Sequence, residues 1–187
     1  MNDEEIVFQP KTEAIYKIIV VGDPAVGKTS LLTKFSTQKF KSQYIPTVGV
    51  NITKEQKELS IGNKKVLVSL MIWDVAGQPQ FYMLHKPYFN GADGMLLVFD
   101  TTRTSTFSNV KNWYSTTVKY GLSGIPRFLI GNKIDLKDER KISKEAHVAH
   151  LSEELNTPYF ETSALTGENV DLIFKEMATA VFQSKNP

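Results

Sequence analysis

The chain has 187 residues and a formal net charge of +2, and 41% of its residues are hydrophobic and 22% charged. These values fit one domain with a proper hydrophobic core, and so small a charge argues against a nucleic-acid partner. The absence of cysteine excludes disulfides, thiolate metal sites and prenyl or palmitoyl anchors on these residues. Because no apolar run approaches membrane-spanning length, we expect a cytoplasmic protein with no direct membrane anchor in this chain. We also expect it to be monomeric. Membrane recruitment would require a longer natural chain with a lipidated tail.

The first elements are an acidic arm and a strand. Residues 1–13 are polar and acidic, so we expect a flexible N-terminal arm in front of a folded domain at 14–184. The apolar, β-branched run 15–21 predicts a buried strand. Apolar residues at helical spacing within 31–35 predict a helix shortly afterwards.

The loop between this strand and helix, Gly22 to Ser30, reads GDPAVGKTS and fits G-x-x-x-x-G-K-[ST], the phosphate-binding P-loop motif. Its glycines let the backbone approach a phosphate, and backbone N–H groups and the positive end of the helix dipole then face the anion. Lys28 can reach the β- and γ-phosphates, and the Thr29 hydroxyl can ligate Mg²⁺. A glycine turn before a solvated lysine is the alternative, but it leaves the flanking strand and helix unexplained.

The rest of the chain alternates strands with helices. Segments 50–59 and 66–73 predict a β-hairpin across a turn at 61–64. Short apolar runs predict further strands at 95–99, 128–130 and 159–160, and helical patterns separate them at 105–120, 143–155 and 168–183. This alternation predicts an α/β fold with a mostly parallel six-stranded sheet, one antiparallel edge strand from the hairpin, and helices on both faces.

In open sheets of this kind, ligands bind beyond the carboxyl ends of the strands. Four of the predicted strands end in a polar or glycine-rich motif. These motifs are the P-loop, Asp74-Val75-Ala76-Gly77-Gln78, Asn132-Lys133-Ile134-Asp135 and Glu161-Thr162-Ser163-Ala164-Leu165. Because the ends of parallel strands lie at one edge of a sheet, we expect the four motifs to form one site.

Taken in order, these four motifs resemble those of Ras-superfamily small GTPases, and segments 45–50 and 88–93, with Trp73, look closest to the Rab-like branch. The resemblance covers about residues 15–183. It implies the three-layer P-loop NTPase fold of small G proteins and a molecular switch that binds GTP or GDP with Mg²⁺ and hydrolyses GTP slowly. Switch loops at 40–50 and 74–90 would recruit effector proteins, and an exchange factor and a GTPase-activating protein are implied as further partners.

The resemblance also implies which residues surround the phosphates and the metal. The nucleotide-binding residues would be Pro24, Ala25, Val26, Gly27, Lys28, Thr29 and Ser30, with Thr47 and Gly77 at the γ-phosphate. The Mg²⁺ ligands would be Thr29, Thr47 and Asp74. Gln78 would orient the attacking water, and Lys28 and Thr47 would complete the catalytic set.

At the base, the resemblance assigns guanine selection to Asp135, whose carboxylate can accept paired hydrogen bonds from the imino and amino groups that adenine lacks. The Lys133 stem would lie along the purine and Phe40 would stack near it. Tyr44 would fold over the nucleotide. The remaining base-side residues would be Asn132, Ser163, Ala164 and Leu165, with the Ala164 N–H facing the guanine carbonyl.

Three features depart from the family pattern. Pro24 offers no N–H at the loop position that faces the γ-phosphate and the catalytic glutamine, so hydrolysis could be altered. Pro79 follows Gln78 where an acidic residue is usual, and should stiffen the start of that switch. The chain ends at Pro187 without the cysteine tail of Rab-like proteins.

Two other functions stay open. One is a GTP-binding interaction module with negligible hydrolysis, for which Pro24 would be the reason. The other, a nucleoside or nucleotide kinase, is disfavoured because the Asn-Lys-x-Asp motif selects guanine and no arginine-rich lid is visible. The chain's three arginines, Arg103, Arg127 and Arg140, lie outside the P-loop and both switch loops. We therefore expect slow intrinsic hydrolysis that needs an arginine or equivalent group from a partner.

Overall fold

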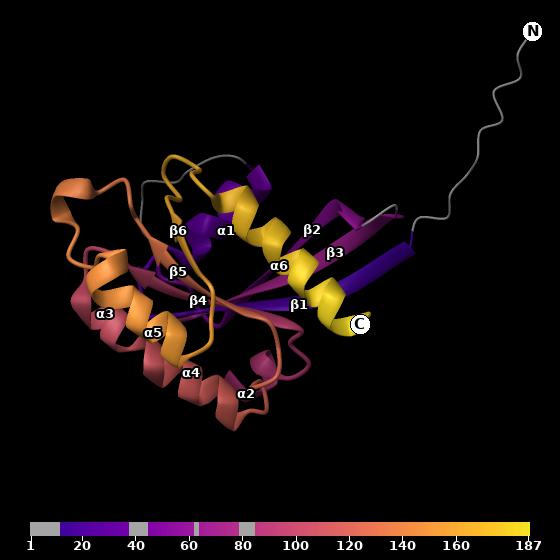
Figure 1. The fold of residues 1–187 in the computed structure, drawn as a ribbon, viewed down its shortest axis with the longest axis horizontal. Helices are drawn as coiled ribbons and strands as arrows, with labels where there is room; N and C mark the ends of the chain where they lie inside the picture. Colours follow the sequence, from indigo (N-terminus) through magenta and orange to yellow (C-terminus); the bar gives the residue numbers. More distant parts are fainter. Residues whose placement is uncertain (1–11, 38–44, 62–63, 79–84) are drawn as a thin grey trace, which may run out of the picture.

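The computed structural model describes residues 12–37, 45–61, 64–78 and 85–187, and within these ranges it contains one six-stranded sheet. The strands are β1 (Thr12–Val21), β2 (Val50–Ile61), β3 (Lys64–Val75), β4 (Gly94–Asp100), β5 (Arg127–Asn132) and β6 (Tyr159–Thr162). Their spatial order is β2-β3-β1-β4-β5-β6, and only the β2–β3 pair is antiparallel (Figure 1). This confirms the predicted sheet with its single antiparallel edge strand.

The helices are α1 (Lys28–Thr37), α2 (His85–Phe89), α3 (Thr104–Ser108), α4 (Val110–Lys119), α5 (Ala149–Glu154) and α6 (Val170–Lys185), with a 3₁₀ turn η2 (Lys137–Glu139) and a π-helical turn η3 (Lys144–Val148). The helix expected at 105–120 is divided at Asn109 into α3 and α4. The helix expected at 143–155 consists of η3 followed directly by α5, and the Ser143 side chain caps it by accepting from the Ala146 N–H. No helix in the described ranges is long and apolar enough to cross a bilayer.

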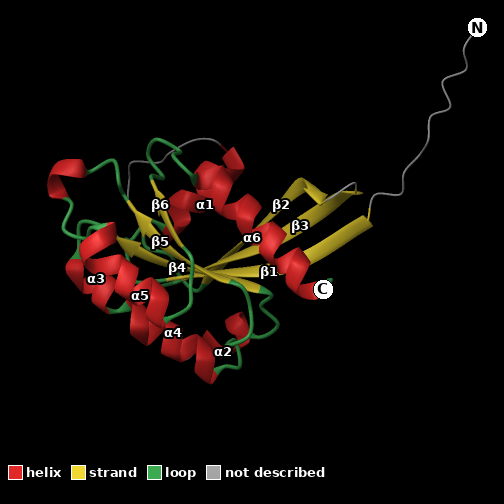
Figure 2. Ribbon diagram, in the orientation of Figure 1, coloured by secondary structure: helices red, strands yellow, loops and turns green. Residues whose placement is uncertain are grey.

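Alternate residues of the central strands point to opposite faces of the sheet, and each face has its own core. Ile18 and Val20 of β1 belong to the core under α1 and α6, where the rings of Phe35 and Phe174 stack with centroids 4.2 Å apart. Their neighbours Ile19 and Val21 belong to the core on the opposite face, under α2, α4 and α5 (Figure 2). Because β1, β3, β4, β5 and β6 run parallel, their carboxyl ends meet at one edge of the sheet, which the helices on the two faces leave uncovered.

The first boundary differs slightly from the expected one. Strand β1 begins at Thr12, two residues inside the segment predicted as an arm. Residues 1–11 lie outside the described ranges, so the flexible arm remains a prediction.

Candidate functional site

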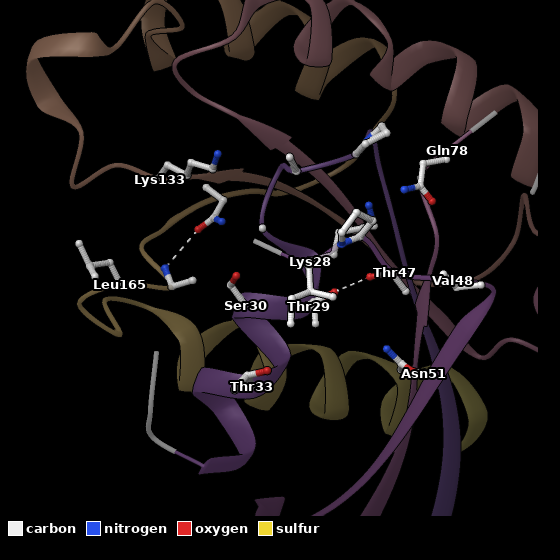
Figure 3. Close-up of a pocket in the computed structure, with 18 of the residues that line it drawn as sticks. Lys28, Thr29, Ser30, Thr33, Thr47, Val48, Asn51, Gln78, Lys133 and Leu165 are labelled. Atoms are coloured by element: carbon white, nitrogen blue, oxygen red, sulfur yellow. Dashed lines mark hydrogen bonds between the residues drawn. The ribbon is translucent and has the colours of Figure 1, made fainter. Parts of the chain in front are cut away.

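A pocket of about 740 Å³ lies at this edge of the sheet. Its size is that of a cofactor or nucleotide site. Thr47 and Gln78 lie at one end of the pocket and Lys133 and Leu165 at the other, with Lys28 between them (Figure 3). The lining contains members of all four motifs, from Pro24 to Leu165 along the chain, so the structure brings them together as expected.

The P-loop adopts a backbone that only glycine permits at two positions. Gly22 and Gly27 have φ angles of +147° and +101°. A Cβ atom at Gly27 would lie 2.2 Å from Asn132 Nδ2, and one at Gly22 would lie 2.1 Å from the Val98 carbonyl oxygen. The loop therefore packs directly on β4 and on the Asn132 side chain, with no room for larger residues.

Lys28 begins α1 and folds back over the loop. Its Nζ donates to the carbonyl oxygens of Gly22 at 2.8 Å and Asp23 at 2.9 Å. Burial lowers the pKa of Lys28 to about 8, while the nearby carboxylates of Asp74 and Asp23 favour the charged form. The ammonium group is thus held in a buried position, where binding an anion would stabilise its charge.

Asp23 anchors the start of the loop to α4. Its Oδ1 accepts hydrogen bonds from Asn109 Nδ2 at 2.5 Å and from the Trp113 indole N–H at 2.8 Å. Trp113 is almost fully buried in the core beneath α4. The P-loop is therefore tied to the helical layer as well as to the sheet.

Three oxygen-bearing side chains meet beside Lys28. Thr29 Oγ1 donates to Asp74 Oδ2 at 2.5 Å and lies 2.8 Å from Thr47 Oγ1. Burial raises the pKa of Asp74, against the opposing effects of the Thr29 hydrogen bond and the Lys28 charge. The other carboxylate oxygen, Oδ1, is buried and has no hydrogen-bond partner among the described residues. Two hydroxyls and a carboxylate with spare acceptor capacity form a hard oxygen donor set, which fits Mg²⁺.

Gly77 and Gln78 follow β3 and face the P-loop. A Cβ atom at Gly77 would lie 2.4 Å from the Gly22 carbonyl oxygen and 2.7 Å from Pro24 N, so this position is in direct backbone contact with the loop. Gln78 is half-buried, and its Oε1 is buried without a hydrogen-bond partner in the part of the chain that is described. An unpaired amide oxygen at this position suits a site that holds a polar ligand or a water molecule.

The Asn132 side chain connects two loops by hydrogen bonds. Its Nδ2 donates to the Val26 carbonyl oxygen at 2.9 Å, and its Oδ1 accepts from Thr162 Oγ1 at 3.1 Å and from the Ala164 N–H at 3.3 Å. The Ala164 N–H, which the resemblance assigns to the guanine carbonyl, is thus directed to Asn132 here. Asn132 lines the pocket, and its amide also holds the P-loop and the loop after β6 together.

Asp135 is positioned by the loop after β6. Its Oδ1 accepts a hydrogen bond from Ser163 Oγ at 2.6 Å, and Ser163 is fully buried. Leu165, by contrast, is 49% exposed at the pocket rim. The carboxylate is fixed by one donor and retains further acceptor sites.

The sequence model described as the Ras family matches residues 17–183 of this chain. The chain belongs to the Ras family. Ras-related protein SEC4 of Candida albicans is 38% identical over 169 residues, which cover 90% of this chain and 78% of the relative. Ras-related protein Rab-13 of Canis lupus familiaris is 35% identical over 164 residues, 88% of this chain and 78% of the relative. GTP-binding protein ypt1 of Schizosaccharomyces pombe is 34% identical over 174 residues, 93% of this chain and 83% of the relative.

These Rab-type relatives confirm the predicted resemblance to the Rab-like branch, and with it the general assignment as a small GTPase. Three residues with predicted roles lie outside the described ranges: Phe40, Tyr44 and Pro79. Their roles in this Ras-family protein remain predictions.

One buried charged residue that supports the site was not identified from the sequence. Asp100 ends β4 and is 1% exposed, and its Oδ2 binds Lys133 Nζ at 2.7 Å and Arg103 Nε at 3.0 Å. Burial acts to raise the pKa of Asp100, but hydrogen bonds from Lys133 and Thr102 together outweigh it and hold the pKa below its usual value. The rule that functional groups lie at the carboxyl ends of strands, applied to β4 as well, would have found it.

Proposed function

We propose that this small GTPase binds GTP and GDP with Mg²⁺, selects guanine through Asp135, and hydrolyses GTP slowly as a switch that recruits effectors. The observation that carries the proposal is that one pocket joins the P-loop at one end to Lys133 and Asp135 at the other. A phosphate-binding loop alone would fit many nucleotides. Joined to a carboxylate at the far end, it fits a guanine nucleotide lying along the pocket.

At the phosphate end, Lys28 and the P-loop N–H groups would bind the phosphates of GDP and GTP alike. Thr29, Thr47 and Asp74 would hold Mg²⁺, which when bound neutralises charge on the phosphate oxygens. Gln78 would orient the attacking water, and its buried, unpaired Oε1 supports that role. Because Lys28 acts on ground state and transition state equally, it would contribute binding more than rate.

The switch would depend on contacts made only with GTP. Thr47 and Gly77 belong to the two loops that line the phosphate end of the pocket. Loss of the γ-phosphate would remove their ligand and change the loops' preferred conformation. Effectors, an exchange factor and a GTPase-activating protein are the partners that such a switch requires.

The second candidate, a GTP-binding module with negligible hydrolysis, is favoured by one observation. Pro24 lines the pocket and its backbone nitrogen lies against Gly77, next to Gln78, which we propose to orient the attacking water. A proline there supplies no N–H to a phosphate oxygen. This candidate shares the binding site of the first and differs from it only in rate.

Competition binding tests the proposed ligand. Protein freed of nucleotide and supplied with Mg²⁺ should bind labelled GDP, and unlabelled GTP should displace the label at far lower concentration than ATP. Equal displacement by ATP and GTP would contradict guanine selection.

Alanine substitutions of Thr29 and Thr47 should affect the binding of GDP and GTP differently. We expect Thr29→Ala to weaken GDP and GTP binding roughly ten- to hundredfold, the loss of one charge-assisted contact of about 1.5–3 kcal/mol. Thr47→Ala should mainly weaken the GTP form, since its loop contacts the γ-phosphate. Dissociation rates of labelled GDP and a GTP analogue, measured with Mg²⁺ and with chelator, check both expectations.

The control for this series is Thr37→Ala, which removes an exposed hydroxyl from the same helix, where it donates to the Thr33 carbonyl. It should leave both rates unchanged. A Thr47 variant that releases both nucleotides at the rates of the parent would argue against its assignment as a switch residue.

A further inference from the structure

Arg103 makes a contact with the P-loop for which neither the resemblance nor the proposed function accounts. Its Nη2 donates to the Pro24 carbonyl oxygen at 2.9 Å across 79 residues of sequence. The guanidinium does not line the pocket, so it approaches the loop from the outer side. It is therefore not placed to act on a phosphate directly.

The guanidinium is itself held in place. Arg103 Nε donates to Asp100 Oδ2 at 3.0 Å, and the Arg103 backbone N–H donates to the Asp100 carbonyl oxygen at 3.0 Å. Asp100 is fixed in turn, because its Oδ1 accepts from the Thr102 N–H at 2.9 Å and from Thr102 Oγ1 at 2.7 Å. An arginine bound through Nε keeps its planar fork in one orientation, and Nη2 is then aimed at Pro24.

The Arg103 contact also fixes the direction of the Ala25 N–H, because this N–H and the Pro24 carbonyl belong to the same peptide group. The peptide bonds of the described residues are trans, so the Pro24 carbonyl and the Ala25 N–H point in opposite directions. Since the carbonyl points outward to Arg103, the N–H points toward the pocket that Pro24 and Ala25 line. Ala25 has a φ of +59°, which is uncommon for a residue with a side chain and needs support from its surroundings.

We infer that Arg103 is a positioning residue for the nucleotide phosphates: it holds the Pro24 carbonyl and so aims the Ala25 N–H into the pocket. A charged donor on the carbonyl also polarises the peptide and makes its N–H a stronger donor. This compensates for Pro24, which has no N–H of its own to offer. The loop then presents the Ala25 N–H in a fixed orientation.

The Asp100 carboxylate also connects the two ends of the pocket. Asp100 Oδ2 accepts from Lys133 Nζ at 2.7 Å as well as from Arg103 Nε. Lys133 lines the base end and Pro24 the phosphate end. Lys133 and Arg103 thus share one buried carboxylate, which connects the base end of the pocket with the P-loop contact.

The inference rests on the proposed function, since it requires a nucleotide phosphate, and it is tested on the full chain loaded with labelled GDP and Mg²⁺. Arg103→Ala should release GDP faster by roughly tenfold or more. Arg103→Lys should fall between this variant and the parent, because one ammonium cannot reproduce both bonds of the fork. The ³¹P resonances of bound GDP should shift in Arg103→Ala, a change in the phosphate surroundings that lower stability alone would not produce.

The matched control is Arg127→Ala. Arg127 also donates to backbone carbonyls, those of Ser123 and Ile125, but at the start of β5, away from the pocket. It should leave the release rate and the ³¹P spectrum as in the parent. Release from Arg103→Ala at the parent rate, or equal acceleration by Arg127→Ala, would overturn the inference while the proposed function stands. Failure of the parent itself to bind GDP would overturn both.

Discussion

Asp135→Asn is expected to exchange guanine selectivity for xanthine selectivity. The carboxylate would accept two hydrogen bonds from guanine, and an amide places a donor opposite one of guanine's donors. Xanthine carries a carbonyl at that position and is matched instead. Sites built on such polar pairs discriminate by about 10⁴-fold, so the change in preference should be large although binding itself falls by only several kcal/mol.

The structure indicates that Asp135→Asn would leave the surroundings of the side chain in place. Ser163 Oγ donates to Asp135 Oδ1, and an asparagine can accept the same hydrogen bond with its side-chain oxygen. Titration of the variant and the parent with GDP and with xanthosine diphosphate measures the exchange. Asp138→Asn, on the exposed turn η2, is the control and should bind as the parent does. An Asp135→Asn protein that still prefers GDP would remove Asp135 from base selection.

The second large effect concerns rate. We expect intrinsic hydrolysis of about 10⁻⁴ to 10⁻³ per second, and acceleration of about 10³–10⁵-fold by a partner that donates an arginine. All three arginines of the chain are engaged elsewhere. Arg103 binds Asp100 and Pro24, Arg127 binds Tyr114, and Arg140 binds Glu161. None of them lines the pocket.

Single-turnover phosphate release, measured with a GTPase-activating domain that acts on Rab-type proteins, tests this expectation. The same domain with its arginine replaced by alanine is the control and should lose most of the acceleration. An intrinsic rate of about 10⁻² per second or more, typical of an arginine supplied within the chain, would contradict the account.

The sheet and its site could be predicted because their signals are local. Buried parallel strands give short apolar runs, and each motif stands at the end of such a run. The division of the 105–120 helix at Asn109 could not be predicted, since the apolar pattern continues through it. The short helix α2 is likewise held by burial of His85 and Phe89 in the core rather than by a local pattern.

The hydrogen bonds that hold the site in place could not be predicted from the sequence, because they join residues far apart in the chain. Asn132 holds Val26 across 106 residues, and Arg103 holds Pro24 across 79. An asparagine or an arginine in the sequence does not indicate which backbone carbonyl its side chain will bind. The motif containing Asn132 points to the base, whereas the structure shows its side chain binding the P-loop and the loop after β6.

The proposed switch requires that this chain converts bound GTP to bound GDP. The direct measurement is to load the purified protein with GTP and Mg²⁺, remove free nucleotide, and identify the bound nucleotide by chromatography over time. We expect gradual replacement of GTP by GDP in the parent and much slower replacement in Gln78→Leu. GTP that stays intact in the parent for many hours, or conversion that continues unchanged in Gln78→Leu, would contradict it.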